Sequence, residues 1–231
     1  MISGISGIYK VVGASLAQKL KFDTISNNLA NINSNAFKKD IVSFDEVLAI
    51  KNSSTTDFTP GPLNYTGNKL DVAIDGPGFF KIQTARGIRY TRNGSFSVNS
   101  EGLLVTQKGD AVLGQNGPIS VIGGDIIIGG DGEIELDGAP ADKIIVVDFA
   151  QSQNLRKEGM SYYIYEGEEK GIFDSNDSTI QQGYTENSNV NPTEEMIKMI
   201  ETLRAFESAQ KVIQTIDELN RKMVNDVGLL Q

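Results

Sequence analysis

The C-terminal stretch, residues 191–227, constrains the fold more than any other part of the chain. Asn191 is a favoured helix cap, Pro192 has the preset φ of a first helical residue, and two glutamates follow where the helix dipole favours negative charge. Apolar residues then recur three and four positions apart, which predicts one long amphipathic helix: Met196, Met199, Leu203, Phe206, Ala209, Ile213, Ile216, Met223 and Val227. At about 1.5 Å per residue this helix is roughly 50 Å long, more than a compact domain can cover, so its apolar stripe needs a partner helix.

A second helical pattern covers residues 3–32. Its apolar residues also recur at helical spacing, with a one-residue slip: Ile5, Ile8, Val12, Leu16, Leu20, Ile25, Leu29 and Ile32. Glycines in the first turns weaken this helix by up to about 1 kcal/mol each relative to alanine. The Asn-rich run that follows predicts a helix end and a turn. An ordinary surface helix is one interpretation, and a partner for the C-terminal helix is the other.

Between these helices the period of the pattern changes from 3.6 to 2. Residues 37–50 are ambiguous between strand and helix, and residues 51–62 are rich in Ser, Thr, Gly and Pro, as in a linker. From residue 65 short alternating segments lie between glycine turns, and Asn93-Gly94 predicts a hairpin. Strands are expected at 70–74, 79–82, 88–92, 95–98, 103–106, 111–113, 119–122, 126–128, 133–136, 144–149, 162–165 and 180–184.

The predicted fold is therefore mainly β with α-helical termini. A central antiparallel β domain of sandwich or barrel type is flanked by two helices, each with an apolar stripe that needs a partner helix from the same chain or from a neighbour. The expected division of the chain is 1–38 for the N-terminal helix, 39–65 for a linker, 66–185 for the β domain and 186–231 for the C-terminal helix.

The composition excludes many classes of function. The 231 residues include no Cys, His or Trp, and the formal net charge is −9. Without Cys and His there is no thiol nucleophile, no Ser–His triad and almost no route to a structural zinc site, so we expect no catalytic, metal or cofactor residues. An acidic chain is a poor ligand for nucleic acid or an anionic membrane. The N-terminus has no positively charged region and no long apolar run, so we expect no membrane insertion; the protein is then either cytoplasmic or exported by a route without a cleaved signal peptide.

Three candidate sites have a simpler structural interpretation. Glycines 129, 130 and 132 with nearby carboxylates do not match a known calcium spacing and read as turns between strands; these carboxylates are Asp125, Asp131, Glu133 and Asp137. Asp71 and Asp75 alternate with apolar residues, as on a solvated strand face rather than in a glycosidase. Gly76-Pro77-Gly78 is followed by a strand and not by the helix of a phosphate site.

Three segments of the chain, in order, resemble the family of bacterial flagellar rod and hook proteins. The N-terminal signature S-x-N-L-A-N-x-N-T-x-G-[FY]-[KR] is met by Ser26, Asn28, Leu29, Ala30, Asn31, Asn33, Phe37 and Lys38, with Ser34 in place of the usual Thr and Ala36 in place of the usual Gly. Residues 66–82 and 90–114 resemble two internal segments of the family. The closing signature is met by Ser188, Asn189, Val190, Asn191, Glu195, Met196, Met199, Ile200, Arg204, Phe206 and Glu207.

Within the family the chain resembles proximal rod proteins most, through Val190-Asn191-Pro192 and Phe206-Glu207, with distal rod proteins as the alternative. The resemblance implies a structural subunit, not an enzyme, exported by the flagellar type III apparatus into the periplasm. It also implies a helical tube that transmits torque, in which the N- and C-terminal helices of each subunit pair as a coiled coil and form the inner layer. Its partners are then copies of itself and other flagellar axial proteins. A subunit that offers its apolar stripe to a different surface of the next subunit makes a heterologous contact, and heterologous contacts that do not close into a ring build filaments.

An alternative of a different class is an acidic binding module or adhesin whose terminal helices fold onto its own β domain. An enzyme is the weakest alternative, because no catalytic constellation is present.

Overall fold

The structure is a computed structural model that describes residues 2–42, 54–159, 161–175 and 177–228, with side chains described from residue 11 onward except at 220 and 223–228. The chain forms two units. The first, called here the helical unit, comprises Met1–Ala30, Asp40–Thr55 and Asn191–Gln231. The second, the β unit, comprises Asn31–Lys39 and Thr56–Val190.

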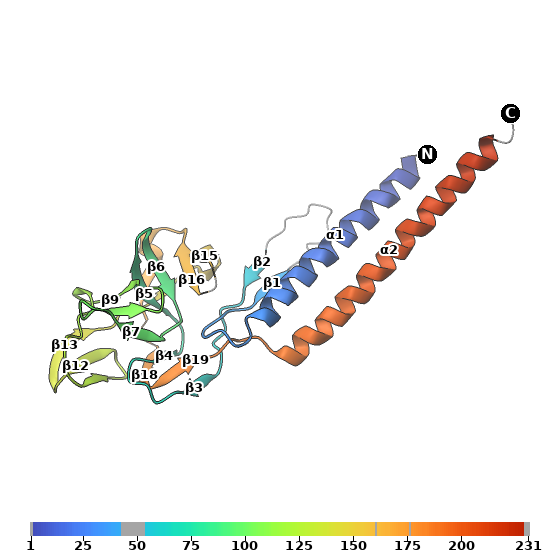
Figure 1. Ribbon diagram of the computed structural model, residues 1–231. Helices are drawn as coiled ribbons and strands as arrows, with labels where there is room; N and C mark the ends of the chain where they lie inside the picture. The colour runs from blue at the N-terminus through green and yellow to red at the C-terminus, as the bar shows by residue number, and fades with distance from the viewer. Residues whose placement is uncertain (1, 43–53, 160, 176, 229–231) are drawn as a thin grey trace. The chain divides into compact units, whose positions relative to one another are not determined.

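The helical unit is built on two antiparallel helices that lie side by side (Figure 1). They are α1 (Ile2–Ala30) and α2 (Pro192–Gly228). The side chain of Asn191 accepts hydrogen bonds from the N–H groups of Thr193 (3.1 Å) and Glu194 (3.3 Å), so the predicted helix cap is confirmed. α1 ends inside the Asn-rich run, as expected. Two short strands, β1 (Asp40–Val42) and β2 (Ser54–Thr56), pair after it.

The β unit contains a ten-stranded main sheet and three smaller sheets. The central path of the main sheet runs β15-β16-β6-β5-β9-β8-β7, while β10 pairs with β9 and β14 pairs with β5 and β17. Its strands are β5 (Phe79–Thr84), β6 (Gly87–Thr91), β7 (Phe96–Val98), β8 (Leu104–Thr106), β9 (Ala111–Gly114), β10 (Gly117–Pro118), β14 (Val146–Phe149), β15 (Leu155–Glu158), β16 (Tyr162–Tyr165) and β17 (Ile172–Asp174). The smaller sheets pair β11 (Ile126–Ile128), β12 (Glu133–Leu136) and β13 (Ala139–Lys143); β4 (Val72–Asp75) and β18 (Thr179–Gln182); and β3 (Leu63–Tyr65) and β19 (Tyr184–Glu186).

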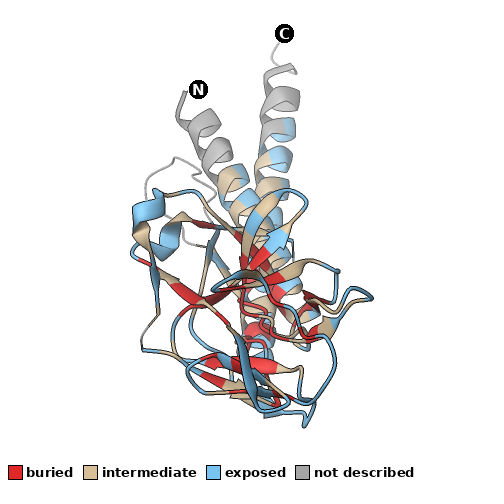
Figure 2. Cartoon of the chain, turned by 90° about the vertical axis from the view of Figure 1, so that its left-hand side faces the viewer, coloured by how far each residue is buried: buried red, intermediate tan, exposed pale blue. Residues whose placement is uncertain are grey.

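These strand pairs are antiparallel, so the predicted fold class, mainly β with helical termini, is confirmed. The main path ends at β15 and β7, so the sheet is open and does not close into a barrel. Buried residues gather in the β unit (Figure 2), where they form two apolar clusters. The larger contains Phe80, Leu104 and Ile134, and the smaller contains aromatic rings such as Phe79 and Phe149.

The hairpin predicted at Asn93-Gly94 is wrong. β6, before it, pairs with β5 and β16, whereas β7, after it, pairs with β8. Gly94 instead passes directly against β4, where the N–H of Val72 donates to its carbonyl oxygen (2.9 Å). A Cβ at residue 94 would lie 1.7 Å from the Val72 carbonyl oxygen. The glycine therefore permits a close backbone approach and not a tight turn.

Several local features differ from the expected pattern. Residues 39–65, expected to be a linker, contain the strands β1, β2 and β3, while residues 43–53 lie outside the described part of the chain. The strand expected at 119–122 is replaced by an isolated bridge between Leu103 and Ser120. β13, β15 and β17 were not predicted because apolar and polar residues alternate little in their sequences, APADK, LRKE and IFD.

Candidate assembly surface and buried charge network

The partly buried face of α2 has the spacing of a coiled-coil seam. Its buried and half-buried positions include Glu195, Met199, Thr202, Phe206, Ala209, Ile213 and Ile216, which alternate between steps of four and three. On α1 the corresponding spacing is followed by Gln18, Phe22, Ile25 and Leu29, of which Ile25 is the most buried. Each helix therefore covers one stripe of the other.

A polar contact lies within this seam. Asn28 of α1 donates to the carboxylate of Glu195 on α2 (3.1 Å), and both side chains are buried. Asn28 also donates to the carbonyl oxygen of Asp40 (3.0 Å) and accepts from its N–H group (3.0 Å). Lys198 donates to the other oxygen of Glu195 (3.0 Å), so the buried carboxylate has a cationic partner.

The structure divides the predicted assembly residues into two groups. Val12 (40% exposed), Leu16 (52%), Met196 (56%) and Leu203 (42%) lie outside the seam. The seam and its margins hold the buried or half-buried members, which are Leu20, Ile25, Leu29, Met199, Phe206, Ile213 and Ile216; Ile32 is half-buried in the β unit, after α1 ends. The side chains of Ile5, Ile8, Met223 and Val227 lie outside the described residues. Four further apolar side chains are also exposed on α2, namely Ile197, Ile200, Val212 and Leu219.

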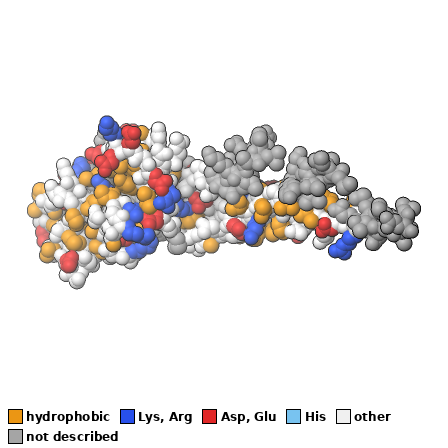
Figure 3. Space-filling view, turned by 90° about the horizontal axis from the view of Figure 1, so that it is seen from above, with side chains coloured by type: hydrophobic (Ala, Val, Ile, Leu, Met, Phe, Trp, Pro, Cys, Tyr) orange, Lys and Arg blue, Asp and Glu red, His pale blue; other side chains and the backbone are white. Residues whose placement is uncertain are grey.

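Hydrophobic side chains accordingly remain visible along the described part of the two helices (Figure 3). Because monomeric proteins rarely leave contiguous apolar patches in water, such a surface marks a site of interaction. We call Met196, Ile197, Ile200 and Leu203, all at the start of α2, the outer face.

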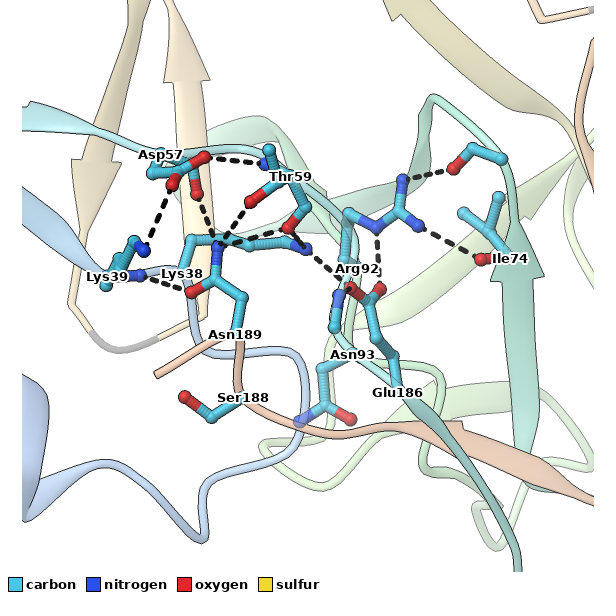
Figure 4. Close-up of polar contacts among 12 residues, drawn as sticks. Lys38, Lys39, Asp57, Thr59, Ile74, Arg92, Asn93, Glu186, Ser188 and Asn189 are labelled. Atoms are coloured by element: carbon cyan, nitrogen blue, oxygen red, sulfur yellow. Dashed lines mark hydrogen bonds and ion pairs between the residues drawn. The ribbon is translucent and has the colours of Figure 1, made fainter. Parts of the chain in front are cut away.

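The β unit contains a buried cluster of charges (Figure 4). Glu186 accepts hydrogen bonds from Lys38 Nζ (2.5 Å) and from Arg92 Nε (2.7 Å), one on each carboxylate oxygen. All three side chains are almost completely excluded from solvent. Arg92 also donates to the carbonyl oxygens of Ile74 (3.0 Å), Gly76 (2.9 Å) and Gly78 (2.8 Å). The guanidinium group thus ties Glu186 to the backbone around β4.

Two cations face one carboxylate in this cluster. Burial lowers the pKa of the Lys38 ammonium below its ordinary value of 10.5; the negative charge of Glu186 opposes this shift, and the positive charge of Arg92 adds to it. Lys38 also donates to the carbonyl oxygen of Thr59 (2.8 Å). A buried charge without such partners would cost several kcal/mol, so loss of the Glu186 carboxylate that both cations share would lower stability by about this much.

Asn189 forms a second link beside the charge cluster (Figure 4). Its side-chain oxygen accepts from the N–H of Lys39 (2.8 Å), and its amide donates to the carbonyl oxygens of Asp57 (2.9 Å) and Thr59 (3.1 Å). The Lys39 ammonium lies 3.5 Å from the Asp57 carboxylate. The start and the end of the β unit are therefore joined by side chains as well as by backbone.

The two sequence signatures meet at this place. Phe37 and Lys38 come from the N-terminal signature and Ser188 and Asn189 from the closing one, and all four are buried or half-buried here. Lys157 Nζ lies 4.1 Å from the centre of the Phe37 ring and donates to the carbonyl oxygen of Lys38 (2.7 Å). The other signature residues lie in α1 (Ser26, Asn28, Leu29, Ala30), in the turn after it (Asn31, Asn33), between β19 and α2 (Val190, Asn191) and in α2 (Glu195, Met196, Met199, Ile200, Arg204, Phe206, Glu207).

Ala36 has a left-handed backbone conformation, with φ of 54°. Glycine adopts this conformation without the steric cost that a side chain carries, which is about 1–2 kcal/mol. This is the position at which the family signature has glycine. Ala36 therefore carries a backbone strain in this turn, where its N–H donates to the carbonyl oxygen of Glu186 (2.7 Å).

Sequence reasoning did not identify Glu186 or Arg92. Glu186 lies two residues before the closing signature, and Arg92 directly precedes the Asn-Gly pair that was taken for a turn. Both are charged residues in strands or next to them, where a solvated face is the usual interpretation. No local pattern shows that their charges are buried together.

The carboxylates considered as calcium ligands have other partners. Asp125 forms an ion pair with Lys69, Asp131 lies 3.6 Å from Lys143, and Asp137 accepts from the N–H of Asp125 (2.9 Å). Asp131 also accepts from the N–H of Glu133 (3.2 Å), which closes a turn. Within the described residues no group of three or more acidic side chains is arranged to hold a metal ion.

Comparison with known proteins identifies the family. The profile described as "Flagellar basal body rod FlgEFG protein C-terminal" matches residues 181–226, and that described as "Flagellar hook protein FlgE/F/G D1 domain" matches residues 73–159. The chain is 34% identical to the flagellar basal-body rod protein FlgG of Bacillus subtilis, over 97% of both chains. The chain belongs to the flagellar basal-body rod protein family. It is also 33% identical to the rod protein FlgF of Caulobacter vibrioides, over 96% of this chain and 98% of that one.

The rod protein FlgF of Mesorhizobium japonicum is 30% identical over 96% of this chain, so the relatives include both FlgF and FlgG proteins. The D1 match lies inside the β unit, and the C-terminal match runs from the last strands of that unit into α2. Neither α1 nor α2, as far as they are described, is apolar enough to cross a lipid bilayer.

Proposed function

We propose that this chain is a non-enzymatic structural subunit of the flagellar rod, and that it assembles through its terminal helices with copies of itself and with other axial proteins. The observation that carries the proposal is the outer face of α2. Its four side chains stay about half exposed although the adjoining face of the same helix is covered by α1. A stripe that the intrachain partner leaves open is available to neighbouring subunits.

The finer features of the proposal rest on the sequence. They are a proximal position in the rod, with a distal position as the alternative, a helical tube that transmits torque, and export through the type III apparatus into the periplasm without signal cleavage. Nucleic acid and membrane lipid have no role in it. FlgF and FlgG relatives are nearly equally identical to this chain, so the choice of proximal over distal depends on Val190-Asn191-Pro192 and Phe206-Glu207.

The seam and the outer face allow a specific test. Leu203→Asp places a charge on the outer face, where the isolated subunit tolerates it but a subunit interface does not, at a cost of several kcal/mol per contact. We expect unchanged helicity of the purified monomer and loss of the subunit from purified basal bodies, as seen by electron microscopy with the subunit labelled.

Gln214→Asp is the matched control, because Gln214 is an exposed polar residue of the same helix. It should leave incorporation into basal bodies unchanged. Normal incorporation of the Leu203→Asp variant would show that the outer face is not the assembly surface.

A further inference from the structure

The chain passes between the helical unit and the β unit four times. The passages follow Ala30, Lys39, Thr55 and Val190, so the segment Asn31–Lys39 enters the β unit and leaves it again within nine residues. Any force that reaches the β unit along the chain must arrive through this segment, through the residues that follow Thr55 or through those that precede Val190.

Two side chains at the end of β19 and just after it, those of Glu186 and Asn189, bind all of these segments. Glu186 binds Lys38 from the first segment, and its second contact on the same oxygen is the N–H of Gly61 (2.8 Å). Asn189 binds the backbone of Lys39 and, on its other side, the carbonyl oxygens of Asp57 and Thr59. Two residues of the segment that ends at Val190 therefore connect the other two segments to each other.

Backbone contacts reinforce this arrangement. The N–H of Ala36 donates to the carbonyl oxygen of Glu186 (2.7 Å), and the N–H of Asn187 donates to that of Pro62 (2.9 Å). Arg92 then fixes Glu186 to the backbone of Ile74, Gly76 and Gly78. The contacts form two layers, an inner layer at Arg92 and an outer layer at Lys38 and Asn189.

We propose that Lys38, Glu186 and Asn189 form a clamp that holds the segments 31–39, 56–61 and 186–190 as one body, and that this outer layer opens without unfolding the sheets of the β unit. The purpose of the clamp rests on the proposed rod function. Torque between the helices and the β unit is then shared by all of these hydrogen bonds at once, so the segments do not detach from the β unit one after another.

Hydrogen exchange of the purified full-length monomer tests the clamp. Asn189→Ala removes the bonds to Lys39, Asp57 and Thr59 without leaving a buried charge, so exchange of residues 31–39 and 56–61 should rise by about tenfold or more. Exchange in β5 and β8 should stay unchanged. The matched control is Asn99→Ala, a half-buried Asn of the same unit that accepts from the N–H groups of Glu101 and Leu103 and should leave residues 31–39 protected.

Two results in the monomer would overturn the proposal: continued protection of residues 31–39 in the Asn189→Ala variant, or an equal rise of exchange throughout β5 and β8. This measurement is independent of assembly, so failure of the rod function would be recognised separately, as absence of the wild-type subunit from basal bodies.

The purpose of the clamp is tested in a motile strain that carries the Asn189→Ala chain as its only copy. We expect normal numbers of basal bodies with rods and normal rotation in dilute medium, with rotation lost in viscous medium, where torque is high. Rotation equal to wild type under load, or absence of assembled rods in dilute medium, would contradict the torque role of the clamp.

Discussion

The ammonium group of Lys38 lies 2.5 Å from the carboxylate of Glu186, which follows it by 148 residues, and neither side chain is accessible to solvent. Arg92 occupies the other carboxylate oxygen. The three charges have unequal roles. Arg92 satisfies Glu186 and three backbone carbonyl groups, whereas Lys38 is the second cation on a single carboxylate.

Removal of the shared carboxylate should therefore cost far more than removal of the second cation. Glu186→Gln leaves two buried cations without a counter-charge, and we expect a loss of about 3–5 kcal/mol in the free energy of unfolding of the β unit. Lys38→Met leaves Glu186 paired with Arg92 and Thr59 bonded to Asn189, so we expect a change of about 1 kcal/mol or less. Urea unfolding followed by tyrosine fluorescence measures both, and equal losses would show that Lys38 is as essential as the carboxylate.

Asn28 should stabilise the helical unit specifically. Asn28→Ala removes three hydrogen bonds, two to the backbone of Asp40 in β1 and one across the seam to Glu195, and should cost about 2 kcal/mol. Thermal unfolding followed by circular dichroism at 222 nm reports on α1 and α2. Lys19→Ala, an exposed change on α1, should stay within about 0.5 kcal/mol of wild type. A smaller effect of Asn28→Ala than of Lys19→Ala would exclude a role for the polar seam contact.

Gly94 should be intolerant of any side chain. The Cβ of Gly94→Ala would lie 1.7 Å from the Val72 carbonyl oxygen, so β4 or the chain beside it must move, and we expect a loss of at least about 3 kcal/mol. Gly109→Ala separates this effect from backbone strain. It has φ of +85° but no atom within 4 Å of the added Cβ, and should cost only about 1–2 kcal/mol. Chemical denaturation of both variants gives the comparison, and similar losses would refute the close-approach argument.

Tyr162 should make the β unit sensitive to alkaline pH. Burial, together with the hydrogen bond that Tyr162 donates to Asp110 (2.8 Å), raises its pKa from 10.0 to about 12. Because the folded pKa is the higher one, the stabilisation is complete below pH 10 and is lost as the pH rises towards 12, by about 1 kcal/mol at pH 11.

The Tyr162→Phe variant isolates this contribution. It should be less stable than wild type at pH 8, where it lacks the hydrogen bonds to Asp110 and Thr106. The difference between the two proteins should shrink by about 1 kcal/mol between pH 8 and pH 11, as measured by urea midpoints. A constant difference over this range would show that Tyr162 does not titrate with an elevated pKa.

Local patterns identified the elements that carry their own periodicity. α1 and α2 follow from apolar residues at helical spacing and from the Asn191 cap, and most strands of the β unit follow from alternation between glycine turns. Patterns did not distinguish the two faces of α2. Met199 and Leu203 lie on one apolar stripe in the sequence, yet α1 covers the first and leaves the second exposed, because a partner helix covers a narrower band than the stripe is wide.

The sequence by itself determined the two terminal helices, the antiparallel β region between them and the lack of cysteine and histidine chemistry, since each depends on composition or on neighbours a few residues apart. Only the tertiary structure decided that Gly94 is a point of close contact and that Lys38, Arg92 and Glu186 share one buried site. Arg92 and Glu186 are 94 residues apart and Lys38 and Glu186 are 148 apart. Burial of a charge depends on which distant segments exclude water from it, and local periodicity does not record this.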